Sequence, residues 1–220
     1  MSLPIVQRLS PPARAVQPLF GGLGLALSRV HEFCGPARVT LAVLLMGQMA
    51  QSTKGGPVIW ILPGWQAERL YPDGIMPLAD PGRLILVRAR RPEDMLWAAE
   101  EALRSGAAPL VVAELPQPPG LTPVRRLHLA AEAGTEAARH AGRGPVLGLM
   151  LTPGDGGAAG VESRWWMAPA PSPSTLVEMG AAWTLRRVRA RMEPEAEWQV
   201  LRGADGVVGV KGRRGAFERR

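Results

Sequence analysis

The chain has 220 residues, 46% of them hydrophobic, which suits one α/β domain with its own core and excludes a chain too polar to fold. The formal charge of +7 favours an anionic or acidic partner, because clustered arginines release the counterions of a nucleic-acid backbone. A single cysteine, Cys34, excludes an intramolecular disulfide and a cysteine-rich zinc site. No apolar run reaches the roughly 18 residues that span a bilayer, so we expect a cytoplasmic protein without membrane contact.

The chain is expected to begin with a flexible arm over residues 1–25, because prolines and a glycine-rich turn interrupt its apolar residues. An ordered domain is predicted over residues 26–201, and it opens with a strand at 29–34 and a buried helix at 39–49. Further continuous apolar runs between turn-forming residues are typical of strands covered on both faces. These strands are predicted at 57–62, 84–87, 110–113 and 146–151.

Two amphipathic helices are predicted between these strands. Pro92 suits the first turn of one helix, which ends at Ser105-Gly106. Thr122 is expected to cap the second helix, with Pro123 in its first turn. Strands that alternate with helices indicate an α/β fold with a mostly parallel sheet flanked by helices, whose ligand crevice lies at the carboxyl ends of the strands.

The sequence changes character beyond residue 152, where a glycine-rich loop leads to two segments of alternating polarity. These segments, 162–167 and 182–191, are predicted to extend the sheet with antiparallel strands. Residues 202–220 are rich in glycine and basic residues, and we expect them to form a disordered tail.

The order of these elements resembles the RecA-like, P-loop NTPase-type fold. In residues 31–41 a predicted strand ends in Gly-Pro and is followed by a helix that carries Thr-Leu, as in the RecA ATPase core. Several other segments resemble, more specifically, the ImuA family of shortened RecA-like proteins. They are residues 68–74, 79–84, 93–106, 121–132 and 160–165, and the resemblance extends over about residues 25–201.

The resemblance implies an accessory role in the SOS response to DNA damage. This role belongs to error-prone translesion synthesis, the process that underlies SOS mutagenesis. The implied partners are ImuB, a catalytically inactive relative of the Y-family polymerases, and an error-prone polymerase of the DNA polymerase III alpha type. RecA is a further candidate partner, as is DNA through the basic C-terminal region. Two alternatives remain open: a DNA-dependent ATPase of the RecA type with a rebuilt nucleotide site, and a cell-division inhibitor of the SulA kind.

The phosphate-loop pattern is incomplete in this chain. A working loop, GxxxxGK[ST], needs backbone N–H groups around a phosphate, a lysine, and a hydroxyl on magnesium. Residues 35–40 lack the second glycine and the lysine, and the loop is shorter, although Arg38 retains a positive charge. We therefore expect no enzymatic activity and no required cofactor, with residual binding of ATP and magnesium as the alternative. The remnants of the site are Gly35, Pro36, Arg38, Thr40 and Glu114.

The acidic residues of the site are also altered. RecA-like enzymes carry a catalytic glutamate just after the second strand, but here Leu62 is followed by Pro63 and Gly64. Glu114 takes the place of the Walker B acid after the third strand. Without the lysine, we expect this carboxylate to cap or pair with a neighbour rather than hold magnesium.

The aromatic and basic residues near the C-terminus are the candidates for contact with a partner or with DNA. One tryptophan of a neighbouring pair on a strand is expected to face the core. The histidines His31, His128 and His140 lack the spacing of a metal site, so we expect no metal. The partner-binding and DNA-binding candidates are Trp165, Trp166, Arg186, Arg187, Arg189 and Arg191.

Overall fold

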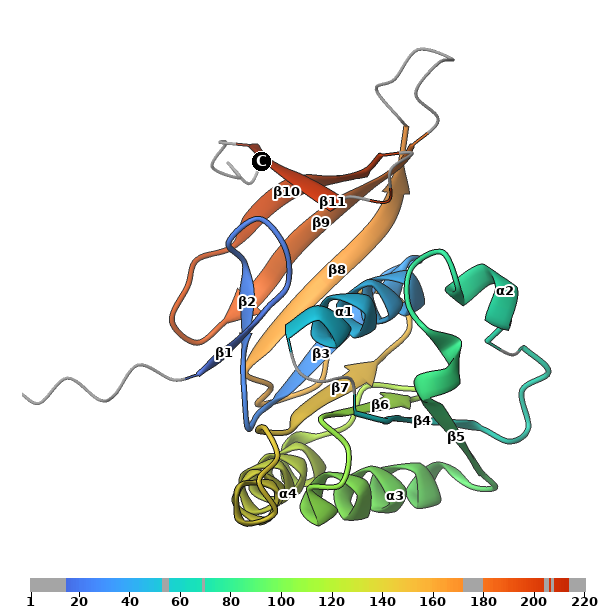
Figure 1. Cartoon of the computed structure of the whole chain (residues 1–220), viewed down its shortest axis with the longest axis vertical. Helices are drawn as coiled ribbons and strands as arrows, with labels where there is room; N and C mark the ends of the chain where they lie inside the picture. Colours follow the sequence, from blue (N-terminus) through green and yellow to red (C-terminus); the bar gives the residue numbers. More distant parts are fainter. Residues whose placement is uncertain are drawn as a thin grey trace, which may run out of the picture.

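A computed structural model describes residues 15–52, 56–68, 70–171, 180–203, 206 and 208–213. The strands of its main sheet are β3 (Val30–Cys34), β4 (Val58–Pro63), β5 (Leu84–Ala89), β6 (Leu110–Glu114), β7 (Leu147–Leu151), β8 (Ser163–Ala170), β9 (Ala181–Ala190), β10 (Ala196–Arg202) and β11 (Val208–Arg213). They lie in the order β11-β10-β9-β8-β3-β7-β6-β4-β5 (Figure 1). The strands from β8 to β5 run parallel, and β9, β10 and β11 continue the sheet antiparallel.

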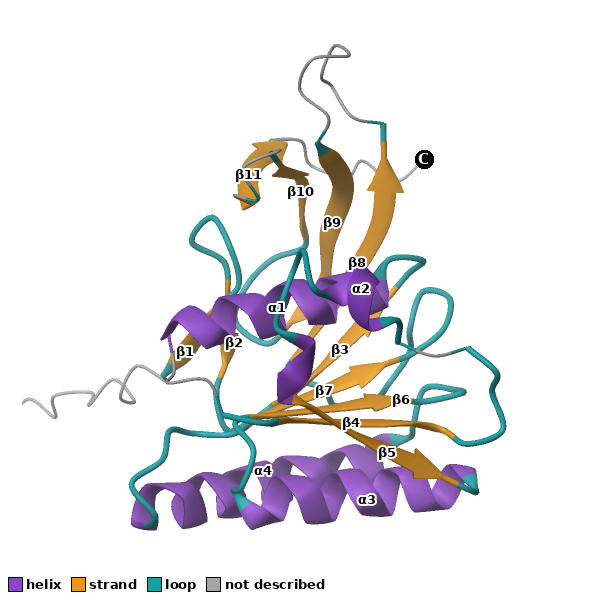
Figure 2. Cartoon of the chain, turned by 45° about the vertical axis from the view of Figure 1, so that its right-hand side comes forward, coloured by secondary structure: helices purple, strands orange, loops and turns teal. Residues whose placement is uncertain are grey.

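The helices cover both faces of the parallel part of the sheet (Figure 2). Helix α1 (Arg38–Ser52) packs on one face, whereas α3 (Pro92–Ser105) and α4 (Leu121–His140) pack on the other. The short helices α2 (Pro72–Ile75) and η1 (Pro81–Arg83) lie in the connection between β4 and β5. The predicted α/β class, the mostly parallel sheet and its antiparallel extension are therefore confirmed. Among the described residues, no helix combines the length and the apolar composition needed to cross a bilayer.

Side chains alternate along the strands between two hydrophobic cores. Trp60 and Trp165 face α1 in one core, and Ile61 and Val111 face α3 and α4 in the other. This arrangement explains the continuous apolar runs of β6 and β7, because both faces of these strands are buried.

Two glycines allow α3 and α4 to approach each other closely. Gly106 ends α3 with a φ of +62°, as predicted for this position. A Cβ at Gly106 would lie 2.3 Å from the backbone oxygen of Gly134, and one at Gly134 would lie 1.8 Å from the oxygen of Leu103. Both positions therefore require glycine.

The structure differs from the flexible arm predicted over residues 1–25. Strands β1 (Val16–Pro18) and β2 (Gly24–Ala26) form an antiparallel hairpin. Leu19, Phe20 and Leu25 are buried in the core on the α1 side, so this segment belongs to the folded domain. The prolines and glycines of this segment are typical of a flexible arm, but its large apolar side chains are buried and hold it in the domain. Residues 1–14 of the predicted arm lie outside the described residues.

The predicted disordered tail over residues 202–220 is wrong for residues 208–213. These residues form β11, which pairs with β10 in antiparallel register from Val208 to Arg213. Glycines and basic residues are compatible with this exposed edge strand, because it needs few buried side chains. The remainder of the predicted tail beyond Arg213 lies outside the described residues.

Three local predictions also change. Strand β5 is an edge strand rather than one covered on both faces, with Ile85 and Leu86 51% and 49% exposed. Helix α4 begins at Leu121 after Gly120, without a side-chain cap from Thr122. Strand β8 is parallel to β3, so the antiparallel extension begins at β9.

Candidate functional site

The turn that corresponds to a phosphate loop comprises residues 35–37, between β3 and α1. The N–H of Gly35 donates to the oxygen of Gly154 at 2.8 Å, and the N–H of Ala37 donates to the oxygen of Met167 at 2.9 Å. The N–H of Arg38 donates back to Gly35 at 3.3 Å, and Pro36 has no N–H. Three of the N–H groups at this turn, those of Gly35, Ala37 and Arg38, are thus engaged by carbonyl groups of the protein itself.

The other remnants of the nucleotide site lie in the first turn of α1 and at the end of β6. The Arg38 side chain donates to the oxygen of Gly35 at 3.3 Å, and Thr40 is half-buried in the first turn of α1. Glu114, at the end of β6, accepts a hydrogen bond from the indole N–H of Trp60 at 2.6 Å. Strand β7 lies between β6, which carries Glu114, and β3, which precedes the turn, so β3 and β6 are about 10 Å apart. Arg38 and Glu114 thus both make hydrogen bonds within the protein itself.

Glu32 is a buried residue that the sequence analysis missed. Its carboxylate accepts hydrogen bonds from Thr152 Oγ1 at 2.6 Å, Gly157 N at 2.9 Å and Ala158 N at 3.0 Å. It also pairs with the guanidinium of Arg164. The loop after β7 is thereby held over the carboxyl end of β3, where ligands of such sheets bind. A charged residue within an apolar strand was the available signal, because a buried carboxylate needs partners.

His31 is likewise buried, in a chain of hydrogen bonds. Its Nε2 donates to the oxygen of Ala26 at 2.9 Å, so its Nδ1 accepts from the hydroxyl of Ser163 at 2.6 Å. The indole N–H of Trp165 donates to the same hydroxyl oxygen at 2.7 Å. Burial lowers the pKa of His31 to about 4, so the ring is neutral and holds β3 against β8 and the hairpin.

The remaining titratable candidates also have structural surroundings. His128 accepts from the N–H of Val30 and donates to the oxygen of Gly160, and burial lowers its pKa. Burial raises the pKa of the Cys34 thiol to about 12, which makes it a poor nucleophile. No group of three or more histidine, cysteine or acidic residues in the described part of the chain is arranged to hold a metal ion.

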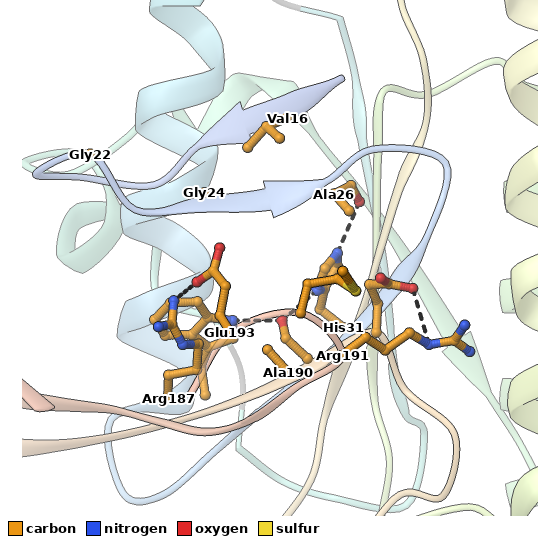
Figure 3. Close-up of a pocket in the computed structure, with 13 residues that line it drawn as sticks. Val16, Gly22, Gly24, Ala26, His31, Arg187, Ala190, Arg191 and Glu193 are labelled. Atoms are coloured by element: carbon orange, nitrogen blue, oxygen red, sulfur yellow. Dashed lines mark hydrogen bonds and ion pairs between the residues drawn. The ribbon is translucent and has the colours of Figure 1, made fainter. Parts of the chain in front are cut away.

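A cavity of about 560 Å³ lies between the β1–β2 hairpin and the turn from β9 to β10 (Figure 3). Two ion pairs border it: Arg187 with Glu193, and Arg191 with Glu162 at 3.5 Å. The neutral ring of His31 lines the same cavity. Its charged groups are thus already paired with each other.

Arg187 was predicted to contact a partner or DNA, but it is only 8% exposed. Its guanidinium lies 5.6 Å from the ring centre of Trp165 and 5.2 Å from that of Trp198. Its Nε donates to the oxygen of Pro194 at 2.9 Å, and desolvation lowers its pKa. Arg187 therefore contacts two tryptophans and the β9–β10 turn inside the fold rather than facing a partner. Trp165, also predicted to contact a partner or DNA, is buried as well.

Other predicted contact residues reach the surface. Trp166 lies on the opposite face of β8 from Trp165, which confirms that one tryptophan of the pair faces the core. Arg186 is directly opposite Trp166 in the register, and its guanidinium lies 5.0 Å above the centre of the indole ring. Arg189 is exposed on β9, and Arg191 is exposed just beyond this strand.

No family model matches the chain. The protein ImuA of Caulobacter vibrioides, in each of two strains, is 32% identical to it over 199 residues, which cover 81% of this chain and 77% of the relative. A crystal structure of SulA from Pseudomonas aeruginosa is 19% identical, with a TM-score of 0.44, and matches 57% of this chain and 98% of that one. The latter similarity is too weak to assign a function. Identity of this extent with the Caulobacter proteins places the chain in the ImuA family.

Proposed function

We propose that this protein is a cytoplasmic accessory factor of damage-induced, error-prone translesion synthesis. It works beside an ImuB-like relative of the Y-family polymerases and an error-prone polymerase of the DNA polymerase III alpha type, and it does not hydrolyse ATP. Membership of the ImuA family supports the link to mutagenesis. The proposed absence of hydrolysis is supported by one observation above all, the engagement of the Gly35 and Ala37 N–H groups by carbonyls of the chain.

Two further contacts support a role without ATP. Glu114, in the place of a Walker B acid, is held by the indole N–H of Trp60. Glu32 accepts hydrogen bonds from the loop after β7, and the Gly154 carbonyl of this loop accepts from the Gly35 N–H. A nucleotide would have to break several of these hydrogen bonds, and each buried group left unsatisfied costs about 1–3 kcal/mol.

Exposed apolar side chains favour the β4–β5 side of the sheet as the surface for the protein partner. Strand β5 is the last strand of the sheet there, and a strand of another protein can pair with such an edge. Several large apolar side chains are exposed on β5 and in the connection that precedes it, namely Trp65, Tyr71, Met76, Ile85 and Leu86. Exposed apolar groups around an open edge are typical of an interaction site.

Co-purification tests the proposed partners. The tagged chain is expressed together with an ImuB homologue, and the bound fraction is compared with that of Leu86→Glu. We expect the charged variant to lose the partner while its thermal transition is unchanged. Arg189→Glu, on the other side of the sheet, serves as the matched control and is expected to retain it. Equal recovery of ImuB by Leu86→Glu would contradict the assignment of this edge.

Titration with a fluorescent ATP analogue, with and without single-stranded DNA, tests the proposed lack of nucleotide chemistry. We expect no saturable binding. Micromolar binding that Glu114→Ala abolishes would instead support the DNA-dependent ATPase. Filamentation of cells that overproduce the chain, in the absence of any effect on mutation frequency, would support the cell-division inhibitor.

A further inference from the structure

One face of strands β8–β11 is not covered by the described helices. Helix α1 lies on the opposite face, and α3 and α4 pack against the part of the sheet from β3 to β5. Figure 2 shows β9, β10 and β11 standing clear of α3 and α4. We call this surface, the face of β8–β11 opposite α1, the open face. It is the one large sheet surface in the described structure to which the proposed accessory role assigns no partner.

A row of hydrogen-bond donors crosses the open face. In the strand register, Thr184 of β9 lies opposite Gln199 of β10, and Gln199 lies opposite Lys211 of β11. Neighbours in such a row are about 5 Å apart, so the hydroxyl, the amide and the ammonium group point the same way within reach of one anion. The three residues line one hollow of about 420 Å³, and none of the described residues around that hollow carries a carboxylate. The hollow therefore suits a phosphate group.

An aromatic platform lies beside this row. Trp166 pairs with Arg186, and the next pair of the same face along these strands is Ala168 with Thr184. Two residues along a strand correspond to about 7 Å, so the platform lies one side-chain step from the donor row. The Arg186 guanidinium lies 5.0 Å above the Trp166 ring. Bases stack both on indole rings and on guanidinium planes.

A carboxylate opposite this platform indicates which group meets the phosphate. Glu197 of β10 lies directly opposite Arg186, so the charge of Arg186 is opposed within its own row. The donor row itself contains no carboxylate, and Lys211 is exposed to solvent. The phosphate contact thus falls to Lys211, Gln199 and Thr184, and the base contact falls to Trp166 and Arg186.

We propose that the open face binds single-stranded DNA, with the donor row on a phosphate and the Trp166–Arg186 platform on an adjacent base. A single strand fits this surface because its bases are free to stack, whereas those of a duplex are already paired. The choice of DNA over RNA rests on the proposed function. Strands β8–β11 and strand β5 lie at opposite ends of the sheet, so DNA on the open face and a protein partner on β5 do not compete.

Fluorescence anisotropy with a labelled oligothymidylate of about 16 nucleotides, the upper size of sites of this kind, tests the proposal. Trp166→Ala is expected to weaken binding by roughly fivefold or more, as for the loss of one base stack. Lys211→Gln is expected to weaken it and to reduce the slope of log affinity against log salt by about 0.7, as for one phosphate contact. Thr184→Val, on the same row, provides a second variant that removes a donor without removing a charge.

Matched controls lie elsewhere on the chain. Trp97→Ala removes an exposed tryptophan from α3, and Arg90→Gln removes one positive charge next to β5. Both are expected to bind the oligonucleotide like the unchanged chain, and thermal melting verifies that all variants are folded. Equal affinity of Trp166→Ala, Lys211→Gln and the unchanged chain would overturn the proposal, as would equal losses in the controls.

Duplex DNA and an oligouridylate of the same length complete the test. Tighter binding of either than of the oligothymidylate would also overturn the proposal. Its failure is distinct from that of the proposed function, because recovery of the ImuB homologue is measured without DNA. A Lys211→Gln variant that loses DNA but still recovers ImuB would support both.

Discussion

The carboxylate of Glu32, fully buried in β3, is paired with the guanidinium of Arg164 in the neighbouring strand β8. The same carboxylate accepts hydrogen bonds from the loop that follows β7. A single acidic group thus links the centre of the sheet to the loop that closes its ligand crevice. Loss of either charge leaves the other without its counter-charge in a poorly solvated place.

Replacement of Glu32 by glutamine is expected to lower the free energy of unfolding by about 3 kcal/mol, the usual order for breaking a buried pair. Urea denaturation measures this change. Hydrogen exchange of residues 152–158 is expected to become faster than in the unchanged chain. Glu101→Gln, in an exposed ion pair with Arg104 on α3, is the control and is expected to change stability by less than about 0.5 kcal/mol. Similar losses from the two variants would contradict the central role of Glu32.

Acid is expected to destabilise the protein through His31. Burial lowers the pKa of this ring from 6.5 in the unfolded chain to about 4 in the folded one. Between these values the unfolded chain binds a proton that the folded chain does not, so the contribution is complete above pH 6.5 and is lost as the pH falls towards 4. The full effect is about 3 kcal/mol.

Denaturation curves across this pH range measure the effect of His31. The His31→Gln variant is expected to have a shallower dependence of stability on pH. His140→Gln, which removes an exposed histidine at the end of α4, should keep the dependence of the unchanged chain. An identical dependence in all three proteins would rule out the buried neutral ring as its source.

Arg187→Ala is expected to destabilise the fold by about 2–4 kcal/mol, because the side chain lies between two tryptophan rings and binds the β9–β10 turn. Arg189→Ala on the same strand is expected to change stability by less than about 0.5 kcal/mol, since Arg189 is exposed. Thermal unfolding, followed by tryptophan fluorescence, compares the two. A stable, native-like Arg187→Ala protein would restore this residue as a surface contact.

Gly35→Ala is expected to cost more than about 2 kcal/mol. The position has a φ of +86°, and a Cβ there would lie 2.5 Å from the oxygen of Met167. Gly142 separates the cost of the backbone conformation from the cost of the close contact, because it has a φ of +67° but open space around it. Its alanine variant is expected to cost about 1 kcal/mol, from the backbone alone. Equal costs would mean that the close approach of β8 to the turn contributes nothing.

The parallel part of the fold could be predicted from the sequence. Runs such as that of β6 are buried on both faces, and Gly106 ends α3 in the left-handed conformation. The period of the apolar residues, the turn residues and the helix ends all act locally, so a single sequence reveals them.

The remaining features depend on contacts between distant segments. The apolar run of β5 resembles that of a central strand, and only the order of strands makes it an edge. Arg187 has the sequence surroundings of a surface arginine, but the pairing of β9 with β10 places Trp198 beside it. The order of the phosphate-loop remnants is visible along the chain, whereas the carbonyls that meet Gly35 and Ala37 come from residues more than a hundred positions away.

The hairpin of β1 and β2 changes what an N-terminal truncation would measure. Removal of the first 25 residues would take away Leu19, Phe20 and Leu25 and expose the surface of α1 that they cover. A shortened chain of this kind would be prone to aggregate, and its failure to capture a partner would report misfolding rather than a lost contact. The shortest useful variant therefore begins no later than Ala15.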